Sequence, residues 1–231
     1  KGLVLYFCLF ILLAVMSLLK YHNLNTTFFD LGLFLNNFSM IASGQWQSLF
    51  LSHIQPFGLL WAIPFYFFST DWAGTVILTL QAAVLVLPVF GLYRYFGIIS
   101  ALAFSFYFPL WYNALFDFHI DHIAIPLLFG FFFFERNGKL LHAFFLGVLL
   151  AFVKEPFAIQ TAFCGLYLCA TRKNYLYGLL LTLFGIVYFT LASQYFIDYF
   201  RSPYINIETS ILNGSYGWLG NNIQEMIKSI A

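Results

Sequence analysis

The sequence predicts an all-α protein, a polytopic bundle of about seven or eight transmembrane helices. The chain of 231 residues is 62% hydrophobic and only 8% charged, whereas roughly a quarter of the residues of an ordinary soluble domain are charged. Apolar runs that approach the ~30 Å thickness of bilayer hydrocarbon also follow one another along the chain. With a net charge of +1 there is no electrostatic reason to expect nucleic acid, so the lipid bilayer is the expected partner.

The predicted membrane segments are separated by short polar turns. They lie at residues 2–19, 73–93, 97–112, 123–134, 140–153, 156–170 and 175–197. Segment 54–68 is also apolar, but Pro56 and Pro64 interrupt it and its length is marginal, so it either crosses the bilayer or re-enters. We expect one transmembrane domain over residues 1–198, followed at 199–231 by the start of an external polar segment of a longer protein.

The first external loop, residues 21–53, contains a predicted amphipathic helix. At helical spacing one face carries the apolar residues Leu31, Phe34, Leu35, Phe38, Ile41 and Ala42. This stretch is too short to span a bilayer, so a helix lying in the membrane interface is expected, with Gly44 as its end. Such a helix would hold Asp30 beside the membrane surface.

The basic residues of the short loops predict the orientation. They recur at every second loop: Arg94, then Arg136 with Lys139, then Arg172 with Lys173. Loops rich in Lys and Arg face the cytoplasm, so the alternate loops at 117–122 and 153–156 should face outward. Asp30 joins that outer side if segment 54–68 does not complete a crossing.

The densest group of ionisable residues is FDFHIDH, in which Asp117, His119, Asp121 and His122 fall within six residues between two apolar runs. Ionisable groups beside hydrocarbon are costly and often mark a functional site. Three interpretations stay open: ligands of a divalent metal ion, groups for general acid–base catalysis, or solvated residues of an exposed loop. The spacing matches no established zinc signature.

Two further polar pairs flank apolar runs. Lys154 and Glu155 precede Pro156, where the lysine either snorkels to the interface or meets a phosphate in a water-filled cavity, oriented by the glutamate. Asp30 and His53 bracket the predicted interfacial helix. An aspartate near a helix start is often a cap, but a carboxylate at the membrane surface could also act as a general base.

The motifs FDLG, DFH and KE, in the runs FFDLGLFLNNFSMIASGQW, FDFHIDHIAIPLL and LLAFVKEPFAI, resemble a prokaryotic family of predicted membrane proteins of unknown function. The resemblance covers residues 28 to about 220, including SYGWLG at 215–220. That family is related to the GT-C glycosyltransferases, which transfer a sugar from a polyprenyl-phosphate donor at the outer face of the membrane. Their catalytic acid lies in the first external loop, which here contains a single acidic residue, Asp30, rather than a pair.

The resemblance implies a GT-C-like glycosyltransferase of the prokaryotic cell membrane, with a polyprenyl-phosphate-linked sugar as donor and a lipid or cell-envelope molecule as acceptor. Asp30 would be the general base, His53, His119, Lys154 and Glu155 would contact substrate or donor phosphate, and Asp117, His119, Asp121 and His122 could ligate a divalent metal ion. The alternative is a transporter with a polar His/Asp/Lys/Glu relay at the bilayer midplane. A third hypothesis, a non-catalytic membrane protein, predicts that Asp30 and His119 point away from each other.

Overall fold

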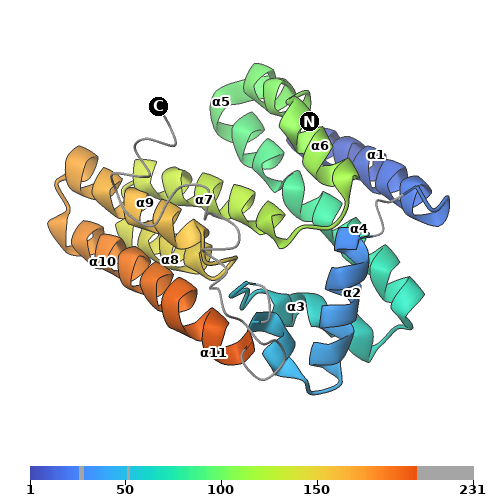
Figure 1. Cartoon of the computed structure of the whole chain (residues 1–231). Helices are drawn as coiled ribbons and strands as arrows, with labels where there is room; N and C mark the ends of the chain where they lie inside the picture. The colour runs from blue at the N-terminus through green and yellow to red at the C-terminus, as the bar shows by residue number, and fades with distance from the viewer. Residues whose placement is uncertain (26–28, 51–52, 202–231) are drawn as a thin grey trace, which may run out of the picture.

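The computed structural model describes residues 1–25, 29–50 and 53–201, and every regular element within these ranges is helical (Figure 1). The elements are α1 Gly2–His22, α2 Phe29–Ala42, η1 Trp46–Phe50, α3 Gly58–Ala62, η2 Ile63–Tyr66, α4 Thr70–Leu85, α5 Leu87–Ser105, α6 Phe108–Phe116, η3 Ile120–Ile123, α7 Ala124–Arg136, α8 Leu140–Ala151, α9 Phe157–Arg172, α10 Tyr175–Leu191, η4 Ala192–Phe196 and α11 Ile197–Arg201. The all-α prediction is therefore confirmed. Nearly all of the predicted external segment 199–231, with the SYGWLG motif, lies outside the described residues.

In the described part of the chain, three helical stretches are long and apolar enough to cross a membrane. They are α1, the α4–α5 stretch Thr70–Ser105 and the α10–η4 stretch Tyr175–Phe196. The helices α7, α8 and α9 coincide with predicted apolar runs but contain 13, 12 and 16 residues, fewer than the ~20 needed to span. The predicted total of seven or eight membrane segments is thus not confirmed.

The membrane character of the surface is visible on α10. Large apolar side chains are exposed along this helix, among them Leu176, Leu179, Leu180, Leu183, Ile186 and Val187. A soluble protein rarely exposes so continuous an apolar face, whereas lipid accepts it directly. On its other side α10 lies so close to α9 that a side chain at Gly178 or Gly185 would collide with the α9 backbone. Glycine at these two positions therefore permits the close approach of the helices.

Segment 54–68 does not form a spanning helix. It folds into α3 and η2, of five and four residues, and both pack against α2. Elements of this length cannot cross hydrocarbon. The segment therefore stays at the end of the bundle that carries α2.

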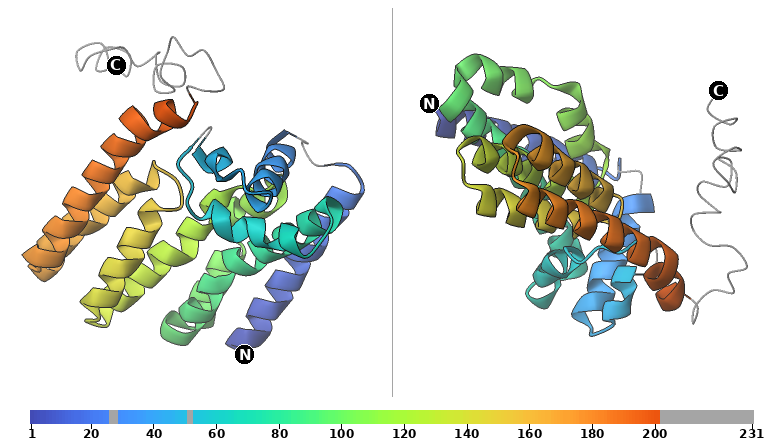
Figure 2. Two further views of the ribbon diagram at one scale, coloured as in Figure 1. Left: turned by 90° about the horizontal axis from the view of Figure 1, so that it is seen from below. Right: turned by 90° about the vertical axis from the view of Figure 1, so that its left-hand side faces the viewer.

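The basic turns lie together at the opposite end. Arg172, at the end of α9, pairs with Glu135, near the end of α7, and Arg136 lies over the ring of Phe96 from α5. Figure 2 shows in its left view that the N-terminus and the turns joining α7 to α8 and α9 to α10 share this end, while α2 and α3 lie at the other. The alternation of loops predicted from the sequence matches this arrangement.

The apolar face of α2 packs on the protein itself. Phe38 of this helix, 2% exposed, lies against Phe118, which is fully buried and also contacts Phe34 and Trp61. Gly44, with φ +92°, follows α2 as expected for a helix stop. The helix predicted for the first loop therefore exists, but its apolar face belongs to the protein core rather than to the lipid interface.

Candidate functional site

Gln81 of α4 fixes the segment that carries DFH. Its side chain is fully buried, and its Nε2 donates to the carbonyl oxygen of Asp117 at 2.9 Å while its Oε1 accepts from the His119 N–H at 3.2 Å. One amide thus satisfies two backbone groups of an extended stretch that has no helical partners. Because both bonds are inside the protein, Gln81 holds the site in place rather than meeting a ligand.

We expect Gln81→Leu to lower the free energy of unfolding by about 1–3 kcal/mol, since it leaves the carbonyl of Asp117 and the N–H of His119 without these hydrogen bonds. The matched control is Gln160→Leu, because Gln160 also lies in an apolar run but is exposed on α9. Its change should stay within about 0.5 kcal/mol. Denaturant unfolding in detergent micelles measures both variants, and equal losses would contradict the anchoring role of Gln81.

Asp30 and His119 meet at the end of the helical bundle that carries α2. The Nε2 atom of His119 lies 3.5 Å from Oδ2 of Asp30, and both side chains are about one-third exposed. The imidazole stacks on Phe116 at 5.6 Å between ring centroids and meets the edge of Phe34 at 6.0 Å. A partly open carboxylate beside an imidazole whose ring plane is held by aromatic contacts is a suitable arrangement for proton transfer.

Lys154 and Asp121 form a second, looser pair. The Nζ atom of Lys154 lies 3.8 Å from Oδ2 of Asp121, with side chains 20% and 35% exposed. This pair joins the turn between α8 and α9 to η3. At this distance the ammonium can exchange its carboxylate partner for another anion without a large rearrangement.

His53 and Glu155 form the third pair. The Nδ1 atom of His53 lies 2.6 Å from Oε1 of Glu155, whose Oε2 accepts from the N–H of Ile54 at 3.0 Å. Glu155 is only 6% exposed, whereas the side chain of His53 is about one-third exposed. Both oxygens of Glu155 are therefore engaged within the protein, and the residue that faces the solvent is His53.

Two of the four ionisable residues of the DFHIDH run are buried. Asp117 is 3% exposed, and His122 is fully buried between the rings of Trp61 and Phe118. The His122 Nδ1 atom faces the carbonyl oxygen of His119, and since a carbonyl only accepts, Nδ1 carries the proton. Burial lowers the pKa of His122 to about 4.

The side chains proposed as metal ligands do not converge. Within residues 1–25, 29–50 and 53–201, no three His, Cys, Asp or Glu side chains lie together in a way that could hold a metal ion. His119 is directed to Asp30, Asp121 to Lys154, and His122 into the aromatic core. The geometry does not fit a metal centre built from Asp117, His119, Asp121 and His122, which stays a prediction without structural support.

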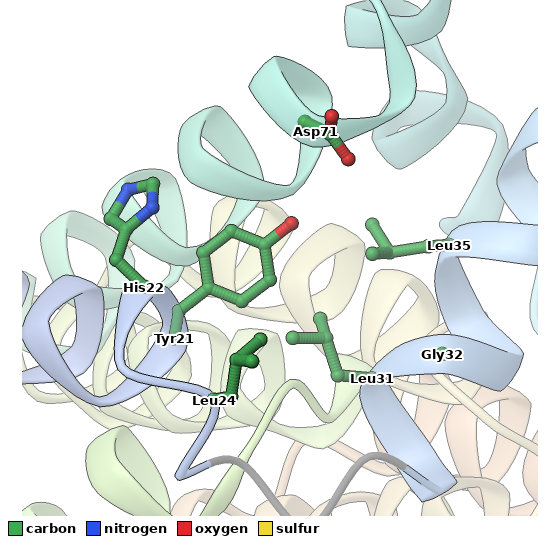
Figure 3. A pocket seen from close by; sticks show the side chains of 7 residues that line it. All are labelled: Tyr21, His22, Leu24, Leu31, Gly32, Leu35 and Asp71. Atoms are coloured by element: carbon green, nitrogen blue, oxygen red, sulfur yellow. The ribbon is translucent and has the colours of Figure 1, made fainter.

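A cavity of about 460 Å³ lies between the end of α1, the start of α2 and the start of α4. Tyr21, His22 and Asp71 supply its polar groups, and Figure 3 shows the Tyr21 side chain reaching between α2 and α4. The sequence did not single out these three residues, because each stands at the border of an apolar run, where polar residues are usual.

Lys20 is a further positioning residue that the sequence did not reveal. Its Nζ donates to the carbonyl oxygens of Leu115 and Phe116 at 2.6 and 3.0 Å, and so caps the carboxyl end of α6 just before the DFH motif. A lysine at the end of an apolar helix is a common interfacial residue. Only its contact with the end of α6 distinguishes Lys20 from an ordinary interfacial lysine.

The fold and these three pairs define a helical membrane protein with a polar, partly open site at one end of its helices. Residues 20–231 match the model of the family described as "Predicted membrane protein (DUF2079)". The chain therefore belongs to that family. No curated protein and no solved structure matches it.

Proposed function

We propose that this protein is a GT-C-like glycosyltransferase of the prokaryotic cell membrane. It would transfer a sugar from a polyprenyl-phosphate donor to a lipid or cell-envelope acceptor at the outer membrane face. The observation that carries this proposal is the 3.5 Å contact between His119 and Asp30, two residues from segments almost ninety positions apart.

The chemistry assigns Asp30 as general base. Its carboxylate takes the proton of the acceptor hydroxyl as the hydroxyl oxygen bonds to the anomeric carbon of the sugar. The bond from that carbon to the phosphate oxygen breaks, and the electron pair leaves with polyprenyl phosphate. His119 holds the Asp30 carboxylate in position through its Nε2.

Lys154 and His53 are assigned to the donor phosphate. Both belong to pairs at the same end of the helices, and each is at least partly exposed. An ammonium group binds phosphate as a point charge, and His53 gains a fixed orientation from the buried Glu155. In this proposal Glu155 positions His53 and does not touch the substrate.

The geometry favours a transferase over the transporter and the non-catalytic hypotheses. A transporter site is expected near the bilayer midplane between broken helices, but Asp30 lies in the first turn of α2 and Lys154 in the turn between α8 and α9. A non-catalytic protein predicts that Asp30 and His119 point apart, whereas their side chains meet.

The test is transfer by the purified protein in proteoliposomes. A panel of radiolabelled polyprenyl-phosphate sugars is supplied with cell-envelope lipids, and transfer is compared between the unmodified chain and Asp30→Asn. Asn36→Ala serves as control, because Asn36 lies on the exposed side of the same helix. Transfer that Asp30→Asn abolishes and the control retains supports the proposal. Equal transfer by both variants, or none by the unmodified chain with any donor, counts against it.

A further inference from the structure

A second site lies at the other end of the molecule. A cavity of about 540 Å³ opens between α5, α7 and α9, far along the helices from the pairs described above. Its lining is largely aromatic, with Tyr95, Phe96, Phe129, Phe132, Phe133 and Tyr167, together with Glu135, Arg136 and Asn137. A pocket of this size is within the range of small-molecule and lipid-headgroup sites.

The charge at this cavity is positive. Glu135 is 3% exposed, and its carboxylate is neutralised by Arg172, whose Nε lies 2.5 Å from Oε1. Among the described residues neither Arg136 nor Arg94 takes part in an ion pair. Each instead lies over an aromatic ring, Arg136 at 5.3 Å from the centroid of Phe96 and Arg94 at 5.7 Å from that of Tyr95. Arg136 lines the cavity, so its guanidinium group is held there and available to an anion, whereas Arg94 is not among the lining residues.

The surroundings indicate which anion. The cavity lies beside the break of α5 at Gly97 and the end of α7, near the basic turns. A membrane protein meets lipid headgroups at such turns, and aromatic rings are typical of that depth. Phe96 and Phe132, 49% and 45% exposed, present apolar surface at the mouth of the cavity. A ligand that carries a phosphate and an apolar tail can contact both the guanidinium group and the exposed aromatic surface. A soluble phosphate can contact only the guanidinium group.

We propose that this cavity binds an anionic phospholipid, with the phosphate at Arg136 and the first part of an acyl chain against the aromatic wall. A net negative headgroup is preferred because no carboxylate at the cavity remains unneutralised to attract the ammonium of a zwitterionic lipid. The site does not involve the Asp30–His119 pair and does not depend on the proposed transferase activity.

The test uses the delipidated protein in neutral detergent, titrated with phosphatidylglycerol, phosphatidylcholine or inorganic phosphate, and bound lipid is counted by native mass spectrometry. We expect phosphatidylglycerol to bind most tightly. Arg136→Gln should weaken it about fivefold, the share of one basic residue at a membrane surface. Lys139→Gln is the control, because Lys139 belongs to the same end but does not line the cavity.

The melting temperature of each lipid-free variant shows whether it is folded, and Phe96→Leu provides a second variant that keeps every charge. Weaker binding in folded Arg136→Gln and Phe96→Leu but not in Lys139→Gln supports the site. Equal binding of phosphatidylcholine and phosphatidylglycerol, equal loss in Lys139→Gln, or saturation by inorganic phosphate alone overturns it.

Discussion

Asp30→Asn is expected to reduce sugar transfer by about 10²–10⁴-fold, the contribution of a positioned general base. The asparagine keeps the shape of the side chain but cannot accept the proton of the acceptor hydroxyl. Because Asp30 is one-third exposed, the substitution should leave the melting temperature almost unchanged. The initial rate at saturating donor, measured on folded protein in proteoliposomes, gives the effect.

A double-mutant cycle with His119→Asn separates the two possible roles of the histidine. If His119 acts by positioning Asp30, His119→Asn lowers the rate on its own but adds nothing to Asp30→Asn. If His119 contacts the donor phosphate independently, the two losses multiply and the KM for donor rises. His142→Asn is the matched control, since His142 is exposed at the start of α8, and multiplied losses would contradict the positioning role.

Many of the helices could be predicted from the sequence because they fall within continuous apolar stretches. Gly97, for example, adopts φ +83° and breaks α5 between two predicted runs. Hydropathy did not reveal the other breaks, since run 73–93 divides between α4 and α5, and run 97–112 between α5 and α6. What hydropathy could not provide is the environment of a helix face. The apolar side of α2 has the spacing of an interfacial helix, yet Phe38 packs on Phe118, eighty residues away.

The site could be predicted only in part for a related reason. Counting basic loops placed His119 and Lys154 on one side and left the side of Asp30 dependent on segment 54–68, and the three do lie at one end of the structure. The pairing was not predictable, because Lys154 and Glu155 are neighbours in sequence but turn to different partners, Asp121 and His53. Adjacent residues at a helix end point in different directions, so their partners depend on the tertiary fold.

His122 is expected to make the protein less stable as the pH falls from about 6.5 to about 4. Its pKa in the folded protein, about 4, lies below the ordinary value of 6.5, because the fully buried ring disfavours the charged form. The unfolded chain therefore takes up the proton first. The contribution of neutral His122 to the free energy of unfolding is fully present above pH 6.5, and about 3 kcal/mol of it is lost by pH 4.

His122→Asn should remove this part of the pH dependence, since asparagine does not titrate and its amide can still donate to the carbonyl oxygen of His119. The variant loses packing between Trp61 and Phe118, so its stability is lower at neutral pH, and the slope rather than the level is the evidence. Denaturant unfolding at several pH values gives both slopes, with His142→Asn expected to keep that of the unmodified chain. Parallel curves for His122→Asn and the unmodified chain would show that the buried imidazole is not the titrating group. If only His122→Asn shows a flatter dependence of the unfolding free energy on pH, His122 is the group whose protonation destabilises the protein in acid.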